Sequence, residues 1–188
     1  MNILLDELPT ITPNNFKIDA DFRNCIRFEL LMQDNKLKKE TKIRLALNLF
    51  YDEIPSNVIL AINDILWLYG NEDNKVYNSN VKTAQKQTSR QIYSFEYDSE
   101  YIYSAFLDQY GIDLNEIEYL HWWKFKAMFK SLKEDNQIIK IMGYRSVDLS
   151  KIKDKEEKKK YTELKKIYAL PDMRTEEQKE KDFGNAFW

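Results

Sequence analysis

The sequence is poor in the residues that make tight turns, disulfides and metal sites. Its 188 residues include 4 Gly, 4 Pro, 1 Cys and 1 His. Because the turns of tight hairpins need Gly or Asn at positive φ, so few glycines argue against a fold of many short hairpins. A single Cys excludes an intrachain disulfide and a zinc site built from several cysteines, and a single His excludes a centre with several histidines from one chain. We therefore expect a helical protein without a metal or another cofactor.

The sequence also lacks a strong excess of charge and any long apolar run. Lys and Arg number 29 against 31 Asp and Glu, which gives a net charge of −2 and no general attraction to nucleic-acid phosphates. The first residues lack the basic and apolar regions of a signal peptide, and no apolar run approaches the ~20 residues that span a bilayer. We expect a soluble cytoplasmic protein with no membrane partner, and nucleic acid is disfavoured as a partner.

Apolar residues recur at helical spacing along most of the chain. They make up 43% of the residues, which is enough to build a core. Stripes at i, i+3, i+4 and i+7 predict helices within 22–32, 43–50, 58–69, 98–110 and 151–166, and an Asp113-to-Glu116 capping box predicts a long helix that continues to Leu132. The predicted fold is an all-α, multi-helix bundle, with a short strand or an extended arm near 1–18 and 92–97.

One stretch differs from the rest of the chain in composition. Only four of the 21 residues in 71–91 are apolar, so ordering this stretch would bury little surface. We interpret 71–91 as a polar linker or mobile loop between an N-terminal helical subdomain, 1–70, and a C-terminal one, 92–188. Packing of the two parts as a single domain is the alternative.

His121 is the only residue that could act as a catalytic imidazole. It could serve as a general base, with Cys25 as a nucleophile, but no catalytic motif surrounds either residue. The simpler interpretation is a partly buried histidine that is hydrogen-bonded among aromatic residues. Phosphate-binding and metal-binding motifs are also missing from the sequence. We therefore expect a protein that is not an enzyme.

Aromatic and basic residues suggest binding surfaces. Trp122 and Trp123 point about 100° apart on a helix, so we expect one to pack inside and the other to meet a second element or a partner. The aromatic stretch 93–106 could stack on nucleic acid, but its acidic residues would repel phosphate. Residues 151–166 hold eight Lys against four acids. They could contact nucleic acid or an acidic partner, although a solvated helix face is favoured.

Four blocks of sequence resemble one phage family. The resemblance covers most of residues 20–145, and Leu-His-Trp-Trp-Lys-Phe is its most specific block together with Tyr-Gly-Ile-Asp-Leu. The chain resembles the tail assembly chaperones of long-tailed siphophages that infect Gram-positive bacteria, whose genes lie between those for the major tail protein and the tape-measure protein. The blocks lie at residues 21–23, 65–70, 102–114 and 120–125.

The resemblance implies a helical, non-catalytic assembly factor in the cytoplasm of the bacterial host, of phage or prophage origin. Such chaperones bind the tape-measure protein, keep it soluble and help recruit tail tube subunits. The implied partners are therefore the tape-measure protein and the tail tube protein, and self-association is a further possibility. The expected partner-binding residues are Trp122, Trp123, Phe125, Phe187 and Trp188. The alternative function is a phage accessory protein that binds nucleic acid or a host protein through its Lys-rich helix and aromatic surface.

Overall fold

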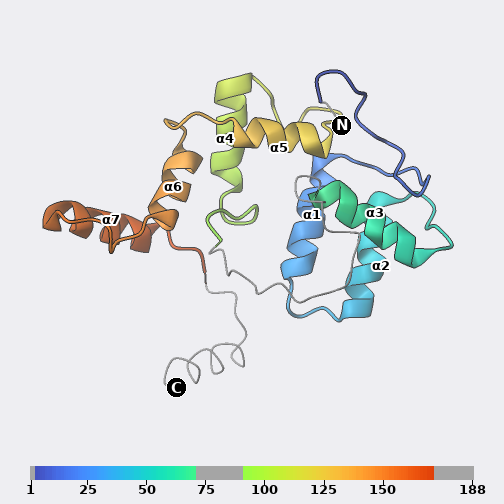
Figure 1. The fold of residues 1–188 in the computed structure, drawn as a ribbon, viewed down its shortest axis with the longest axis horizontal. Helices are drawn as coiled ribbons and strands as arrows, with labels where there is room; N and C mark the ends of the chain where they lie inside the picture. Colours follow the sequence, from blue (N-terminus) through green and yellow to red (C-terminus); the bar gives the residue numbers. More distant parts are fainter. Residues whose placement is uncertain (1–2, 71–90, 172–188) are drawn as a thin grey trace.

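The computed structural model describes residues 3–70 and 91–171, and this part of the chain forms seven helices and no strand (Figure 1). The predicted all-α fold is therefore confirmed. Most of the predicted linker, residues 71–90, lies outside the described residues, as do Phe187 and Trp188. The helices are α1 (Phe22–Gln33), α2 (Lys39–Phe50), α3 (Val58–Gly70), α4 (Ser99–Tyr110), α5 (Trp122–Lys130), α6 (Gln137–Ser146) and α7 (Lys155–Ile167).

The first three helices pack in sequence order, α1 on α2 and α2 on α3, and α5 joins them by packing on α1. The sequence offers Asp19 or Asp21 as the cap of the first helix, and the structure uses Asp21, whose carboxylate accepts a hydrogen bond from the Arg23 N–H at 3.0 Å. Between α1 and α2, Phe28 and Phe50 meet edge to face with ring centroids 5.7 Å apart. These contacts place α3 on the outside of the group.

The remaining helices form a second series, in which α4 packs on α6 and α6 packs on α7. Helix α4 ends at Gly111, whose φ of 65° is the left-handed conformation that glycine adopts without strain. Helix α7 projects from the body (Figure 1), and none of its residues is buried. Aromatic contacts of Tyr144 with Tyr161 and Tyr168 attach it to α6.

The two segments expected to be short strands or extended arms are irregular. In the N-terminal arm the regular pairing is a single isolated bridge between Ile11 and Lys17. Residues 95–97 form a turn that leads into α4. The turn is fixed by Asp98, whose carboxylate accepts the Ser94 N–H at 2.8 Å.

Asp98 also belongs to a buried ion pair that joins distant parts of the chain. Arg145 of α6 donates two hydrogen bonds to the Asp98 carboxylate, at 2.5 and 2.9 Å. The same guanidinium donates to the Ile92 carbonyl at 3.1 Å and to the Tyr168 carbonyl at 2.6 Å. One side chain therefore ties together the segment before α4, helix α6 and the end of α7.

The long helix expected from Asp113 does not form, and this prediction is wrong. The Asp113 carboxylate accepts the N–H groups of Asn115 and Glu116, but the chain then turns away, and α5 begins only at Trp122. In this segment Arg23 donates to the Leu114 carbonyl at 2.9 Å and to the Ile117 carbonyl at 2.6 Å. Contacts with α1 therefore satisfy both carbonyls where the expected helix is missing.

One cluster of buried side chains includes residues from both sides of the undescribed stretch. Phe125 lies in its centre, stacked on Phe22 and on Phe106, each with ring centroids 4.9 Å apart. The cluster thus connects α1, α4 and α5. None of the described helices combines the length and the apolar character that a bilayer span requires.

Candidate protein-binding surface

Three of the five aromatic residues that the sequence offers for partner binding lie in the core, and the other two, Phe187 and Trp188, lie outside the described residues. Trp122, Trp123 and Phe125 expose only 3%, 6% and 1% of their surface. Both tryptophans are buried, and of the two alternatives expected for the second one, a second element or a partner, the structure shows a second element, helix α3. Both stand in the first turn of α5, where the end of α3 covers them: Tyr69 stacks on Trp122 at 5.5 Å and Trp67 meets Trp123 at 5.2 Å.

The two indoles complete the hydrogen bonding of α3. The last carbonyls of a helix have no partner within the helix. Here the Trp123 indole N–H donates to the Leu68 carbonyl at 2.7 Å, and the Trp122 indole N–H donates to the Tyr69 carbonyl at 3.1 Å. The ammonium of Lys126 also donates to the Tyr69 carbonyl at 3.1 Å, which is the favourable charge for a helix C-terminus. The adjacent tryptophans therefore hold α3 in place.

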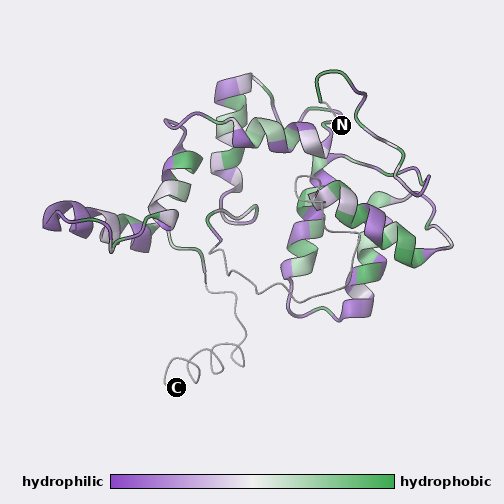
Figure 2. Cartoon of the chain, viewed as in Figure 1, coloured by the Kyte–Doolittle hydropathy of each residue, from purple (hydrophilic) through white to green (hydrophobic). Residues whose placement is uncertain are grey.

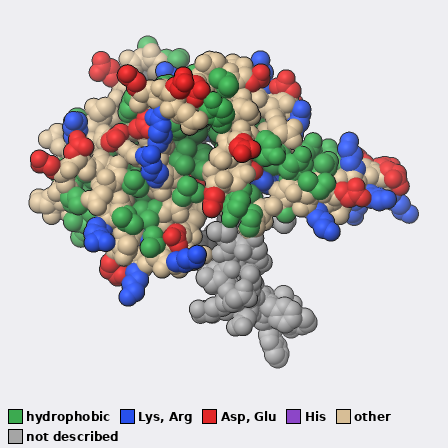
Figure 3. All heavy atoms as spheres, turned by 180° about the vertical axis from the view of Figure 1, so that it is seen from behind, with side chains coloured by type: hydrophobic (Ala, Val, Ile, Leu, Met, Phe, Trp, Pro, Cys, Tyr) green, Lys and Arg blue, Asp and Glu red, His purple; other side chains and the backbone are tan. Residues whose placement is uncertain are grey.

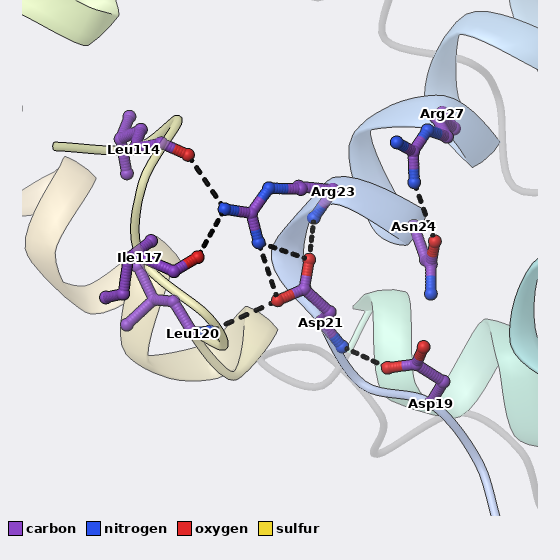
Figure 4. A network of polar contacts seen from close by, with 8 residues as sticks. All are labelled: Asp19, Asp21, Arg23, Asn24, Arg27, Leu114, Ile117 and Leu120. Carbon is purple, nitrogen blue, oxygen red and sulfur yellow. Dashed lines mark hydrogen bonds and ion pairs between the residues drawn. The ribbon is translucent and has the colours of Figure 1, made fainter.

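Two of the sequence blocks that carry the family resemblance meet in space. Residues 20–22 pair with 120–122 across an isolated bridge, in which the Phe22 N–H donates to the Leu120 carbonyl and the Trp122 N–H donates to the Ala20 carbonyl. Figure 4 shows Asp21 accepting the Leu120 N–H at 3.1 Å and pairing with Arg23 at 3.2 Å. These blocks thus have a folding role, which is to join α1 to the start of α5.

His121 is the N-cap of α5, in agreement with the simpler interpretation of this residue. It is 3% exposed, and its Nδ1 accepts the Trp123 N–H at 3.1 Å. Its Nε2 lies 3.2 Å from the Pro9 carbonyl, so Nε2 carries the proton and the ring is neutral. Burial lowers the pKa of His121. Cys25 is buried as well, and burial raises the pKa of its thiol. Burial therefore activates neither the imidazole as a charged group nor the thiol as a thiolate.

Further polar contacts fix the inner side of α3. The Asp64 carboxylate accepts the Thr12 hydroxyl at 2.5 Å and the Asn14 amide at 2.8 Å, which fastens the N-terminal arm to the middle of α3. The Tyr51 hydroxyl donates to the Ala61 carbonyl at 3.0 Å. Tyr69 donates to Glu29 of α1, and burial raises the pKa of that carboxyl. These contacts hold α3 along its whole length.

The opposite side of α3 is mainly apolar and mainly exposed. We call Val58, Ile59, Ile62 and Leu66 the α3 outer face; Ile62 is half-buried against the core, and the exposed Asn63 lies on the same side. Ile59 is 75% exposed and Leu66 is 37% exposed. Figure 2 contrasts the mainly hydrophobic α3 with the mainly hydrophilic α7. Ile59 and Leu66 lie off the apolar stripe that the sequence predicts for this helix, whereas Val58 belongs to that stripe and is exposed all the same.

The other candidate sites are weaker in the structure. Within the aromatic stretch 93–106, Phe95 and Phe106 are buried, while Tyr97 and Tyr101 are exposed. Five of the six lysines of α7 are exposed, in agreement with a solvated helix face, while Lys165 is half-buried and donates to the Val147 carbonyl. Among the described residues, no group of three or more His, Cys, Asp or Glu is placed to hold a metal ion. The α3 outer face is therefore the best candidate for function.

Comparison with known proteins gives one finding. The family described as Bacteriophage Gp15 protein matches residues 4–170, a range that contains all seven helices of the described residues. No curated protein and no solved structure matches the chain.

Proposed function

The chain belongs to the bacteriophage Gp15 protein family, and from that premise we propose that it is a non-catalytic tail assembly chaperone. In this proposal it binds the tape-measure protein, keeps it soluble in the cytoplasm of the host and helps to recruit tail tube subunits. The phage family and the resemblance of its aromatic blocks to tail assembly chaperones support this assignment. The observation that carries it is the exposed, firmly held α3 outer face.

A tape-measure protein would meet this face through its own apolar helical stripes. An amphipathic helix of the client can pack along Ile59, Ile62 and Leu66, as helices pack into apolar grooves. Covering one large exposed aliphatic side chain contributes roughly 1–2 kcal/mol, so one copy binds weakly. Many copies along a long client would retain it by avidity and could still be displaced when tube subunits arrive.

The contacts that hold α3 in place suit a surface that binds a client helix. Its end is held by Trp122 and Trp123, and its middle by the Asp64 contacts, so a client does not have to order the helix on binding. A preformed surface avoids that entropic cost, which otherwise weakens association. In the proposal the buried tryptophans therefore act indirectly, by presenting the α3 outer face.

The proposal is tested by co-expression with the tape-measure protein of the same phage. The client should be soluble with the wild-type chain and should precipitate with Ile59→Ser/Leu66→Ser. Leu107→Ser is the matched control, because Leu107 is also an exposed aliphatic residue, at 44%, but lies on α4. Leu66 is 37% and Leu107 44% exposed, so each control of folding is made by circular dichroism, which should show the same helix content in both variants as in the wild type.

Equal client solubility with and without the wild-type chain would refute the chaperone role. Full activity of Ile59→Ser/Leu66→Ser would refute the assignment to α3. The alternative, nucleic-acid binding through α7, predicts complexes that weaken as the salt concentration rises.

A further inference from the structure

One polar residue interrupts the α3 outer face. Asn63 is exposed and stands four residues after Ile59 and three residues before Leu66, so the three side chains follow one line along the helix. Figure 2 shows a hydrophilic band in the middle of the mainly hydrophobic α3. Among the described residues, none hydrogen-bonds to the Asn63 amide, so a partner can use both its donor and its acceptor groups.

The spacing of these three residues is that of a coiled-coil seam. In a heptad pattern, the residues that face a second helix follow one another at separations of three and four residues. We call Ile59, Asn63 and Leu66 the α3 seam, and Ile62 borders it, half-buried against the core. The α3 seam therefore presents a partner helix with two aliphatic positions and with an amide between them.

A helix that covers the α3 seam also covers the amide of Asn63. Removing an amide from water without giving it a hydrogen-bond partner costs free energy, and a single Asn in a seam fixes the register of paired helices for this reason. A partner with only aliphatic side chains at this point leaves Asn63 unpaired, whereas a partner with an amide or a hydroxyl there restores the hydrogen bond. Asn63 thus distinguishes between two kinds of apolar helix.

The charges of α3 cannot make this distinction. The one charged residue of the helix, Asp64, is 2% exposed and accepts hydrogen bonds from Thr12 and Asn14, so it lies away from the outer face. Figure 3 shows the side of the molecule opposite to the view of Figure 1, where Lys, Arg, Asp and Glu side chains are scattered among exposed hydrophobic ones. On the α3 seam, by contrast, the amide is the group that can select a partner.

We propose that Asn63 selects the segments of the client that α3 binds. The preferred segment is a helix whose apolar stripe holds one Asn, Gln, Ser or Thr, with a large aliphatic residue one turn before it and one turn after it. Ile59 and Leu66 pack on the aliphatic residues, while Asn63 hydrogen-bonds to the polar one. Copies of the chain therefore bind at defined places along the client rather than at any apolar stretch. This inference rests on the proposed chaperone function, which supplies the client helix.

The test uses overlapping peptides of about 21 residues, or three heptads, that cover the tape-measure protein of the same phage. Their binding to the full chain is measured by fluorescence anisotropy, and each peptide that binds is remade with Leu in place of the polar residue in its stripe. The wild-type chain should bind the remade peptide at least about tenfold more weakly, because Asn63 is then buried without a partner.

Variants of Asn63 complete the test. Asn63→Leu should reverse the preference and bind the remade peptide more tightly than the original, because the seam is then wholly apolar. Asn63→Ser keeps a hydrogen-bonding group and should retain the wild-type preference. Asn48→Leu is the matched control, since Asn48 is an exposed asparagine on α2, and it should behave as the wild type does.

The outcomes separate this inference from the proposed function. A client that stays insoluble and contributes no binding peptide refutes the chaperone role itself. Peptide binding that Ile59→Ser/Leu66→Ser abolishes, but in which wild type and Asn63→Leu show the same preference, refutes the selection by Asn63 alone. So do binding peptides whose stripes hold no polar residue. A dimer of the chain that Ile59→Ser/Leu66→Ser dissociates in sedimentation would make a second copy the occupant of the α3 seam and would also refute the inference. Circular dichroism confirms that each variant keeps its helices.

Discussion

Replacing Arg145 by Met is the most informative test of how the C-terminal helices are attached. The guanidinium makes four hydrogen bonds, two to Asp98 and one each to the carbonyls of Ile92 and Tyr168. In Arg145→Met, the Asp98 carboxylate, 1% exposed, keeps only the Ser94 N–H. Leaving one partner of a buried ion pair uncompensated costs about 3–5 kcal/mol, so we expect a loss of that size in the free energy of unfolding.

The matched control is a pair at the surface. Asp148 and Lys151 lie 3.8 Å apart, but their side chains are 52% and 83% exposed. An exposed pair contributes about 0–1 kcal/mol, so Lys151→Met should have almost no effect. The measurement is urea unfolding followed by tryptophan fluorescence, since Trp122 and Trp123 are buried in the core. Asp98→Asn/Arg145→Met removes both charges and should recover part of the lost stability.

The location of the effect is as diagnostic as its size. Because Arg145 connects the segment before α4 with α6 and the end of α7, hydrogen exchange in Arg145→Met should accelerate first in α6 and α7. An Arg145→Met variant within about 1 kcal/mol of the wild type would refute the reasoning. Uniform acceleration over all helices would show that the pair stabilises the whole fold rather than this attachment.

Three further predictions follow from single residues. Because burial lowers the pKa of His121, the unfolded chain takes up a proton at a higher pH than the folded chain. The contribution of His121 to the free energy of unfolding should therefore be complete above the usual pKa of 6.5 and should fall as the pH drops below it. His121→Asn keeps a capping group and should remove this pH dependence in urea titrations. Gly111→Ala should lower the free energy of unfolding by about 1–2 kcal/mol, measured by thermal unfolding. The positive φ is the cause rather than a clash, because a Cβ at this position meets no neighbour within 4 Å; a neutral substitution would refute this. Cys25 is 0% exposed, so a thiol reagent at pH 8 should label it only after unfolding, and rapid labelling of the folded chain would contradict its burial.

Local sequence signals predict much of this fold. The Asp21 cap of α1 and the Gly111 end of α4 are where the sequence places them, because both depend on hydrogen bonds or backbone conformation within a few residues. The start of α5 could not be predicted in this way. The irregular segment before α5 is held by Arg23, 91 residues before Leu114, and no local pattern contains that contact.

The binding surface is harder to predict than the helices. Trp122 and Trp123 are typical interface residues by type, yet the end of α3 covers them. Conversely, Ile59 and Leu66 are typical core residues by type, yet they are exposed. Both results depend on which helix lies beside which, and that arrangement is set by long-range contacts such as Asp64 with Thr12.

The indole hydrogen bonds at the end of α3 have a practical consequence for protein engineering. The Leu68 and Tyr69 carbonyls find their donors in Trp122, Trp123 and Lys126, which lie more than fifty residues further along the chain. These carbonyls are thus satisfied from α5 and do not need donors from the residues that directly follow Gly70. A fluorescent protein or an affinity tag inserted within 71–90 should therefore leave α3 intact, and this stretch offers a site for a probe that reports on assembly in the cell.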